Sequence, residues 1–242
     1  LAQFDIKDAV LKKCLLKEDE TVITVPDGVT TIGKDALCGL QSVIAVTLPE
    51  SLKVINDGAF YGCSSLTSVT LPGSVERLGS CAFAQCSALN TIYLDNKLTE
   101  IGNSAFWGCT NLESIDIPAG VTKIGYNLFG SCLSLISVSL PDTVTELDER
   151  AFKECTSLAC ITLPDSLTKI GNMAFLNCRN LKSVNIPDRL ESIGEKAFFM
   201  CESLHELEIP DGIASVGGDA FSDCVSVTVR STISGKPLYK AV

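Results

Sequence analysis

A period of 23 residues runs through most of this chain. Eight prolines mark it, and each gap between them is 23 residues or a multiple of 23: Pro26, Pro49, Pro72, Pro118, Pro141, Pro164, Pro187 and Pro210. Asp95 stands where the series skips a proline, so nine units follow one another without insertion. Self-similarity at a fixed period of this size is typical of stacked repeats, and it therefore limits the fold more than any single motif does.

Apolar residues occupy fixed columns when positions are counted from each proline as zero. Two columns are nearly uniform: +11, with Leu37 and then phenylalanine to Phe221, and +14, with Leu40 and then cysteine to Cys224. Other apolar columns lie at +3, +6, +10, +17, +20 and +22, and the +10 column is alanine except for Leu128. Because one unit cannot bury these residues alone, we expect neighbouring units to close one continuous core.

The local pattern within a unit predicts its secondary structure. Apolar and polar residues alternate at the end of each unit, as in residues 112–117, which is the period of a half-buried strand. Proline then stops the strand, and Gly or Ser at +2 with frequent Gly at +7 permits tight turns. The Ala-Phe pair and the following Cys and Leu have the spacing of one face of a short helical turn.

The segment Leu66-Thr67-Ser68-Val69-Thr70-Leu71 resembles the strand signature of leucine-rich repeats. Over about residues 23–229 the full unit is similar to the bacterial BspA-like, or Treponema-type, class of that family. The expected fold is an α/β solenoid, a right-handed superhelix of nine 23-residue repeats. It would carry a parallel β-sheet on the concave face and short helical turns on the other side. We expect residues 1–22 to form an N-terminal cap, because they include enough apolar residues for a hairpin. We expect residues 230–242 to form a C-terminal cap edge or a linker.

Charge and hydropathy exclude two classes of partner. The chain has 19 Lys and Arg against 29 Asp and Glu, a net charge of −10, which argues against nucleic acid. No stretch approaches the ~18 uninterrupted apolar residues that a spanning helix needs, so we expect no membrane insertion in this segment. The start at Leu1, without Met or a signal-type segment, favours a processed or trimmed fragment.

Eight of the 12 cysteines fall in the +14 column. Leu40 occupies the same column, which indicates a buried apolar pocket and a ladder of reduced thiols rather than disulfides or a metal site. The other four are Cys14, Cys38, Cys81 and Cys160. Cys160, on a predicted strand, should point outward and be the most reactive.

Catalytic signals are sparse. His205 is the one histidine, and no nucleophile motif accompanies it. Acidic residues are scattered singly, and the sequence has neither a phosphate loop nor a Ca²⁺ loop. We therefore expect no catalytic residues, no metal and no cofactor.

Two surfaces are candidates for binding. The first is the strand face formed by positions +19 and +21, where most residues are small and polar and hydroxyl packing alone would explain them. This pattern has four exceptions close together near the missing proline: Tyr93, Asp95, Glu113 and Asp116. An aromatic anchor among near-neutral neighbours is typical of a recognition site.

The second surface is the flank at +12, a position of variable residue size. Tyr61 and Trp107, the sole tryptophan, lie there two units apart. They form either a hot spot or semi-buried rings that rest on neighbouring turns.

The resemblance implies a secreted or cell-surface bacterial protein. Our leading hypothesis is a non-catalytic binding module that adheres to an extracellular protein or glycan of a host or neighbouring cell. The alternative is a structural spacer or scaffold that presents another domain of a longer surface protein. The buried thiols would also suit a cytoplasmic interaction protein.

Overall fold

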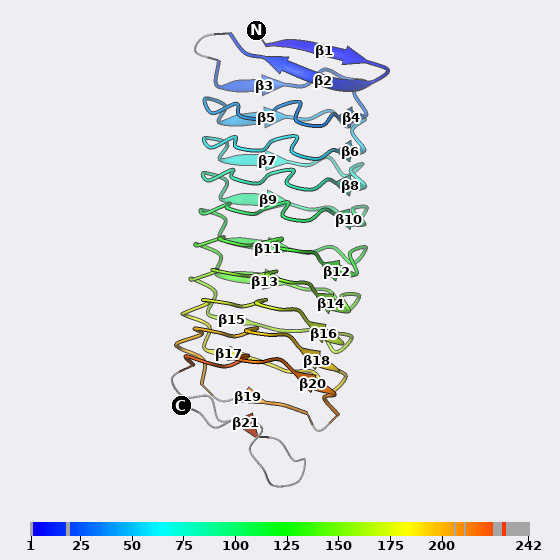
Figure 1. Ribbon diagram of the computed structural model, residues 1–242. Coiled ribbons are helices and arrows are strands. Elements are labelled where there is room, and N and C mark those ends of the chain that lie inside the picture. Colours follow the sequence, from blue (N-terminus) through cyan, green and yellow to red (C-terminus); the bar gives the residue numbers. More distant parts are fainter. Residues whose placement is uncertain (1, 18–19, 206, 211, 225–228, 231–242) are drawn as a thin grey trace.

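The computed structural model describes residues 2–17, 20–205, 207–210, 212–224 and 229–230. The chain winds into a stack of similar coils, one for each 23-residue unit (Figure 1). Each coil has three sides, which we call the long-strand side (positions +19 to +21), the short-strand side (+4 to +7) and the turn side (+8 to +17). The predicted repeat solenoid with parallel sheets is confirmed.

The long-strand side carries the odd-numbered strands from β3 onward. Its sheets have the orders β3-β5-β7-β9, β11-β13, β15-β17 and β19-β21. The strands are β3 (Val22–Thr24), β5 (Ala45–Thr47), β7 (Ser68–Thr70), β9 (Thr91–Tyr93), β11 (Ser114–Asp116), β13 (Ser137–Ser139), β15 (Cys160–Ile161), β17 (Ser183–Val184), β19 (Leu207–Glu208) and β21 (Val229–Arg230).

The short-strand side carries two-residue strands. Its sheets have the orders β1-β2-β4-β6-β8-β10 and β12-β14-β16-β18-β20. The strands are β4 (Thr31–Ile32), β6 (Val54–Ile55), β8 (Arg77–Leu78), β10 (Glu100–Ile101), β12 (Lys123–Ile124), β14 (Glu146–Leu147), β16 (Lys169–Ile170), β18 (Ser192–Ile193) and β20 (Ser215–Val216). Within both sets the neighbouring strands are parallel.

An antiparallel hairpin covers the N-terminal end of the stack. It consists of β1 (Gln3–Lys7) and β2 (Val10–Leu15), and β2 pairs in parallel with β4. Leu11 and Cys14 of β2 are buried, whereas most of β1 is exposed. The predicted C-terminal cap edge or linker at residues 230–242 lies almost wholly outside the described residues.

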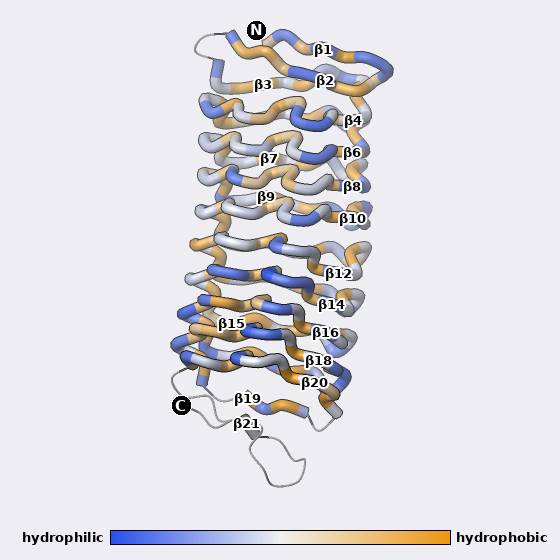
Figure 2. Tube along the Cα trace, viewed as in Figure 1, coloured by the Kyte–Doolittle hydropathy of each residue, from blue (hydrophilic) through white to orange (hydrophobic). Residues whose placement is uncertain are grey.

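A column of phenylalanine rings forms the axis of the core. Successive rings from Phe60 to Phe221 stack with centroids 4.9 to 5.9 Å apart and interplanar angles of 3° to 14°. The alanine, cysteine and leucine columns are buried around it, as the periodicity predicts. Figure 2 shows the resulting alternation of hydrophobic and hydrophilic stretches along each coil.

The prediction of short helical turns is wrong, because the described residues contain no helix. On the turn side the backbone N–H groups alternate in direction. Those of Ala59 and Tyr61 bond within the coil, to Asn56 O and Gly58 O, while that of Phe60 bonds to Ala82 O of the next coil. A helix would keep all three bonds within the segment, so this side is a series of tight turns and a third ladder between coils.

Left-handed backbone makes these turns. Positions +9 and +13 have φ between +52° and +73° in each of the nine units, usually without glycine, as at Arg150 (+60°) and Met200 (+59°). A positive φ reverses the chain direction but costs energy for residues with a Cβ. The glycines at +7 have another cause: a Cβ on Gly171 would lie 2.6 Å from the backbone of Asp148 in the preceding coil. At Gly171, glycine is therefore required for the close approach of two backbones rather than for a tight turn.

Candidate binding surface

The long-strand side presents a row of small polar side chains. In β7, Ser68 and Thr70 are exposed on either side of the buried Val69, and β9, β11 and β13 repeat the pattern. This is the alternation expected of a sheet with one buried face and one solvated face. Equivalent residues of neighbouring coils are adjacent because the strands pair with a register of one unit, as Ser68 does with Thr91.

Tyr93 is the exception in this row. Its side chain is 73% exposed, the largest exposure among the large apolar residues that the structure describes. It borders a hollow of about 110 Å³ between β9 and β11, and Asp116 borders the same hollow from the other strand. The remaining lining residues are Thr91, Ile92, Leu94, Ser114 and Ile115. An exposed ring beside a small hollow, with a carboxylate opposite, can receive one side chain of a partner.

Asp95 and Glu113 lie near this pair but do not line the hollow. The Asp95 carboxylate accepts the backbone N–H of Lys97 at 3.1 Å, so it shapes the turn that elsewhere contains proline. Glu113 is exposed just before β11, and its carbonyl accepts the N–H of Ile136 at 2.8 Å. Of the four residues predicted for this face, Tyr93 and Asp116 line the same hollow, and Asp95 and Glu113 do not.

Tyr61 and Trp107 lie on the turn side, in the column of the third ladder. The carbonyl of Tyr61 accepts the N–H of Gly39, and that of Trp107 accepts the N–H of Gln85. Tyr61 is 38% exposed, Trp107 is half-buried, and Ala84 between them is buried. The two rings therefore belong to a separate surface from Tyr93.

The cysteine column is buried, as predicted, but it is more than an apolar pocket. Each of its eight thiols donates to the +11 carbonyl of the preceding coil, as Cys132 does to Phe106 O at 3.2 Å. Burial raises the pKa of Cys178 to about 12. These thiols hold coils together, and those with a raised pKa, such as Cys178, are poor nucleophiles because the thiolate is the reactive form. Cys38 and Cys160 are exposed, the latter as predicted.

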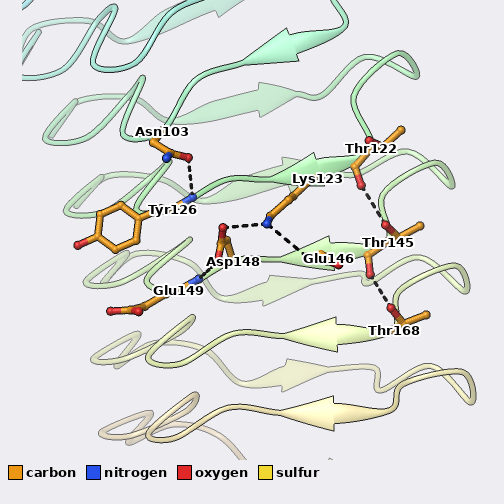
Figure 3. Close-up of polar contacts among 9 residues, drawn as sticks. All are labelled: Asn103, Thr122, Lys123, Tyr126, Thr145, Glu146, Asp148, Glu149 and Thr168. Carbon is orange, nitrogen blue, oxygen red and sulfur yellow. Dashed lines mark hydrogen bonds and ion pairs between the residues drawn. The ribbon is translucent and has the colours of Figure 1, made fainter.

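Charged side chains on the short-strand side form pairs that the sequence analysis missed. Lys123 Nζ lies 3.3 Å from Glu146 and 3.0 Å from Asp148 (Figure 3). The Asp148 carboxylate also accepts the N–H of Glu149 at 2.8 Å, and the pKa of Asp148 is lowered despite the opposing effect of partial burial. Opposite charges one period apart, as at Lys123 and Glu146, are the sequence signal that would have found this pair.

A larger hollow of about 540 Å³ lies on the short-strand side, along β16, β18 and β20. Its acidic lining residues are already paired with cations: Asp148 with Lys123, Glu149 with Arg150 and Glu195 with Lys196. Glycines of the +7 column line much of it. The hollow therefore reflects missing side chains, and Lys169 is its one basic lining residue.

Catalytic or metal-binding clusters are not evident in the part of the chain that the structure describes. No group of three or more His, Cys, Asp or Glu residues there could hold a metal ion. His205 is exposed beside the long-strand side. Within the same residues, nothing helical has the length and apolar character that crossing a bilayer requires.

Comparisons with known proteins agree with the coil architecture. The chain is similar in structure to a leucine-rich repeat protein from Bacteroides ovatus, at 24% identity and a TM-score of 0.79 over 96% of this chain and 70% of that one. It is also similar to a leucine rich cell surface protein from Faecalibacterium prausnitzii, at 24% identity and a TM-score of 0.58 over 97% and 94%. The T. pallidum leucine-rich repeat protein has 24% identity and a TM-score of 0.52 over 94% and 88%.

None of the curated proteins compared with the chain matches it significantly. A family profile does match: the BspA type leucine rich repeat region, over residues 5–136 and 122–236. These two ranges together span nearly the whole chain and contain the proline, phenylalanine and cysteine columns. The chain therefore belongs to the BspA-type leucine-rich repeat family.

Proposed function

We propose that this chain is a non-catalytic binding module of a secreted or cell-surface bacterial protein, which adheres to an extracellular protein or glycan of a host or neighbouring cell. Membership of the BspA-type family supports a repeat scaffold that binds other molecules through its side chains. The name of the Faecalibacterium prausnitzii relative, a cell surface protein, supports the extracellular location.

The observation that carries this proposal is the row of small exposed side chains on the long-strand side, with the Tyr93 ring at its middle. Small polar residues let a partner approach the sheet closely along several coils. Tyr93 and Asp116 add an aromatic ring and a carboxylate beside a hollow of about 110 Å³. A buried aromatic anchor surrounded by energetically neutral contacts is the usual composition of a binding hot spot.

A non-catalytic role fits the distribution of reactive groups. The eight column thiols are buried and engaged with backbone carbonyls. The exposed Cys160 and His205 lie on surfaces that the two hollows do not include. A catalytic site needs such groups to converge in a pocket.

The test is binding of the purified chain to a panel of extracellular matrix proteins, surface glycans and bacterial cells. Tyr93→Ala and Asp116→Ala probe the long-strand side, and Trp107→Ala probes the turn side. Saturable binding that both long-strand variants weaken at least tenfold would support the proposal. Loss in Trp107→Ala alone would move the binding site to the turn side. An absence of binding across the panel would favour the spacer or scaffold role.

A further inference from the structure

Both strand sides are interrupted at one coil boundary. The long-strand sheet ends at β9 and resumes at β11, and the short-strand sheet ends at β10 and resumes at β12. Further interruptions on the long-strand side follow β13 and β17, but the short-strand sheet runs past both without a break. Among the described residues, the boundary between residues 91–113 and 114–136 is the one place where both sheets stop.

Backbone hydrogen bonds of the short-strand side are missing at this boundary. Gly102 N–H donates to Leu78 O at 2.8 Å, and Asp148 N–H donates to Ile124 O at 2.8 Å, each reaching the preceding coil. The backbone bonds of the described residues include no such bond from Gly125, which holds the same position between them. The two backbones therefore separate on this side.

Side chains and glycines show the same opening. Thr145 and Thr168 each donate a hydroxyl hydrogen bond to the carbonyl one coil earlier, at 3.3 and 3.2 Å (Figure 3), whereas the described contacts include none from the Thr122 hydroxyl. A Cβ on Gly171 would be 2.6 Å from preceding backbone, but a Cβ on Gly125 would find the nearest backbone atom of Asn103 at 4.0 Å. At this position the gap is thus wider by more than an ångström, whereas at Gly120 of the same coil a Cβ would still lie 2.6 Å from Leu98 O, so this widening is local to the short-strand side.

The turn side still connects the two coils. Ser104 N–H donates to Tyr126 O at 2.9 Å, and Gly108 N–H donates to Gly130 O at 2.9 Å. Between them, Phe106 N–H donates to Leu128 O at 3.2 Å, whereas the equivalent bonds at the other boundaries measure 2.7 to 2.9 Å. One edge of the boundary is therefore held, whereas the sheets of the other two are interrupted.

Leu128 provides the physical cause. It is fully buried in the column that holds alanine in the other eight units, next to Ala105 in the preceding coil. Three additional carbon atoms in a close-packed column must push neighbouring coils apart. The Phe106 and Phe129 rings, on either side of this boundary, have centroids 5.7 Å apart, and the one wider spacing, 5.9 Å, lies one coil earlier between Phe83 and Phe106.

We infer that this boundary is a hinge, at which the N-terminal and C-terminal coils bend relative to each other about the intact turn side, with Leu128 as the wedge that opens it. At the other boundaries between described coils the short-strand sheet runs through and resists bending, including those where the long-strand sheet is interrupted. Tyr93 and Asp116 lie across this hinge, so bending changes the width of the hollow between them. The inference rests on the backbone geometry and stands whether or not the proposed binding function is correct.

Spin-label distance measurements test the hinge. In a background with Cys38→Ser, Cys81→Ser and Cys160→Ser, one pair of labels at Ser68→Cys and Ser137→Cys spans the boundary. The control pair at Ser114→Cys and Ser183→Cys is separated by the same 69 residues and crosses the one-sheet interruption after β13. We expect a broader distance distribution for the first pair, and equal widths would overturn the hinge.

Adding Leu128→Ala to both labelled proteins tests the wedge. We expect the distribution of the spanning pair to narrow to that of the control pair, which itself should not change. A spanning distribution that stays broad would overturn the role of Leu128.

Amide hydrogen exchange of the unmodified chain provides a readout without any substitution, in case Leu128→Ala does not fold. The Gly125 N–H should exchange at least tenfold faster than those of Gly102 and Asp148. Equal protection of the three amides would overturn the opening itself.

Discussion

The Sγ atom of Cys109 lies 3.1 Å from the carbonyl oxygen of Phe83, in the preceding coil. The seven other cysteines of the column make the same bond at 3.1 to 3.2 Å. A cysteine side chain is small and apolar enough for the core and also provides a weak donor. The column therefore links coils as well as filling space between them.

Replacing Cys109 with alanine should weaken the stack. The change removes a buried sulfur atom and one hydrogen bond between coils, so we expect a loss of about 1–3 kcal/mol in the free energy of unfolding. Urea denaturation measures it. Cys160→Ala is the matched control and should change stability by less than about 0.5 kcal/mol, because that thiol is exposed. Similar losses of unfolding free energy for Cys109→Ala and Cys160→Ala would contradict a stabilising role of the buried cysteine column.

Alkaline pH should destabilise the fold. Burial raises the pKa of Cys109 from 9.0 to about 12 in the folded chain. A thiol whose pKa is raised on folding stabilises the protein below its unfolded pKa, and this contribution is lost as pH rises towards the folded pKa. The loss per thiol is about 1.4 kcal/mol for each pH unit in that window.

Urea denaturation at pH 8, 9, 10 and 11 measures this dependence. The free energy of unfolding should fall steadily above pH 9, and the slope should be shallower in a Cys109→Ala/Cys178→Ala double variant. A slope that the double variant leaves unchanged would contradict the assignment to these thiols.

The left-handed turns predict opposite effects of glycine and alanine at position +13. Gly62 has φ +71° and Gln85, one coil later, has φ +60°. We expect Gly62→Ala to cost about 1 kcal/mol and Gln85→Gly to be neutral or stabilising by up to about 1 kcal/mol. Thermal denaturation of the two variants checks this. A stabilising Gly62→Ala would mean that the backbone there is not left-handed.

Two glycines of the +7 column should respond differently to alanine. Gly171→Ala places a Cβ against the Asp148 backbone and should cost about 1–3 kcal/mol. Gly125→Ala meets the Asn103 side-chain oxygen, at 2.8 Å, rather than backbone, because the coils are further apart there. That oxygen accepts the N–H of Tyr126 at 3.2 Å, so the cost should be that of weakening one exposed hydrogen bond, about 0.5–1 kcal/mol. Equal costs in urea denaturation would contradict the wider spacing at Gly125.

Much of this architecture could be predicted from periodicity. The spacing of Phe106, Cys109 and Leu112 correctly predicts which residues are buried, and the alternation around Ile115 correctly predicts an exposed strand face. The turn side could not be distinguished from a helix, because both structures repeat apolar residues every three or four positions. Residues such as Arg150 and Met200 give no sign of a positive φ, which the stacking of coils imposes on them.

The irregular region near Asp95 could be located but not interpreted. The absent proline and the leucine at residue 128 both appear in the sequence as exceptions to their columns. A larger side chain can fit within its column, or it can separate neighbouring coils along both sheets. Which of these happens depends on the distances between coils, which the sequence pattern does not contain. The juxtaposition of Tyr93 and Asp116 across that opening follows from the same distances.

We propose above all that the long-strand side around Tyr93 recognises a macromolecule. The most direct measurement is the dissociation constant of the wild-type chain, Tyr93→Ala and Trp107→Ala for the partner with the highest affinity in the binding panel. We expect a loss of at least tenfold for Tyr93→Ala and less than twofold for Trp107→Ala. An unchanged affinity in Tyr93→Ala would contradict the claim.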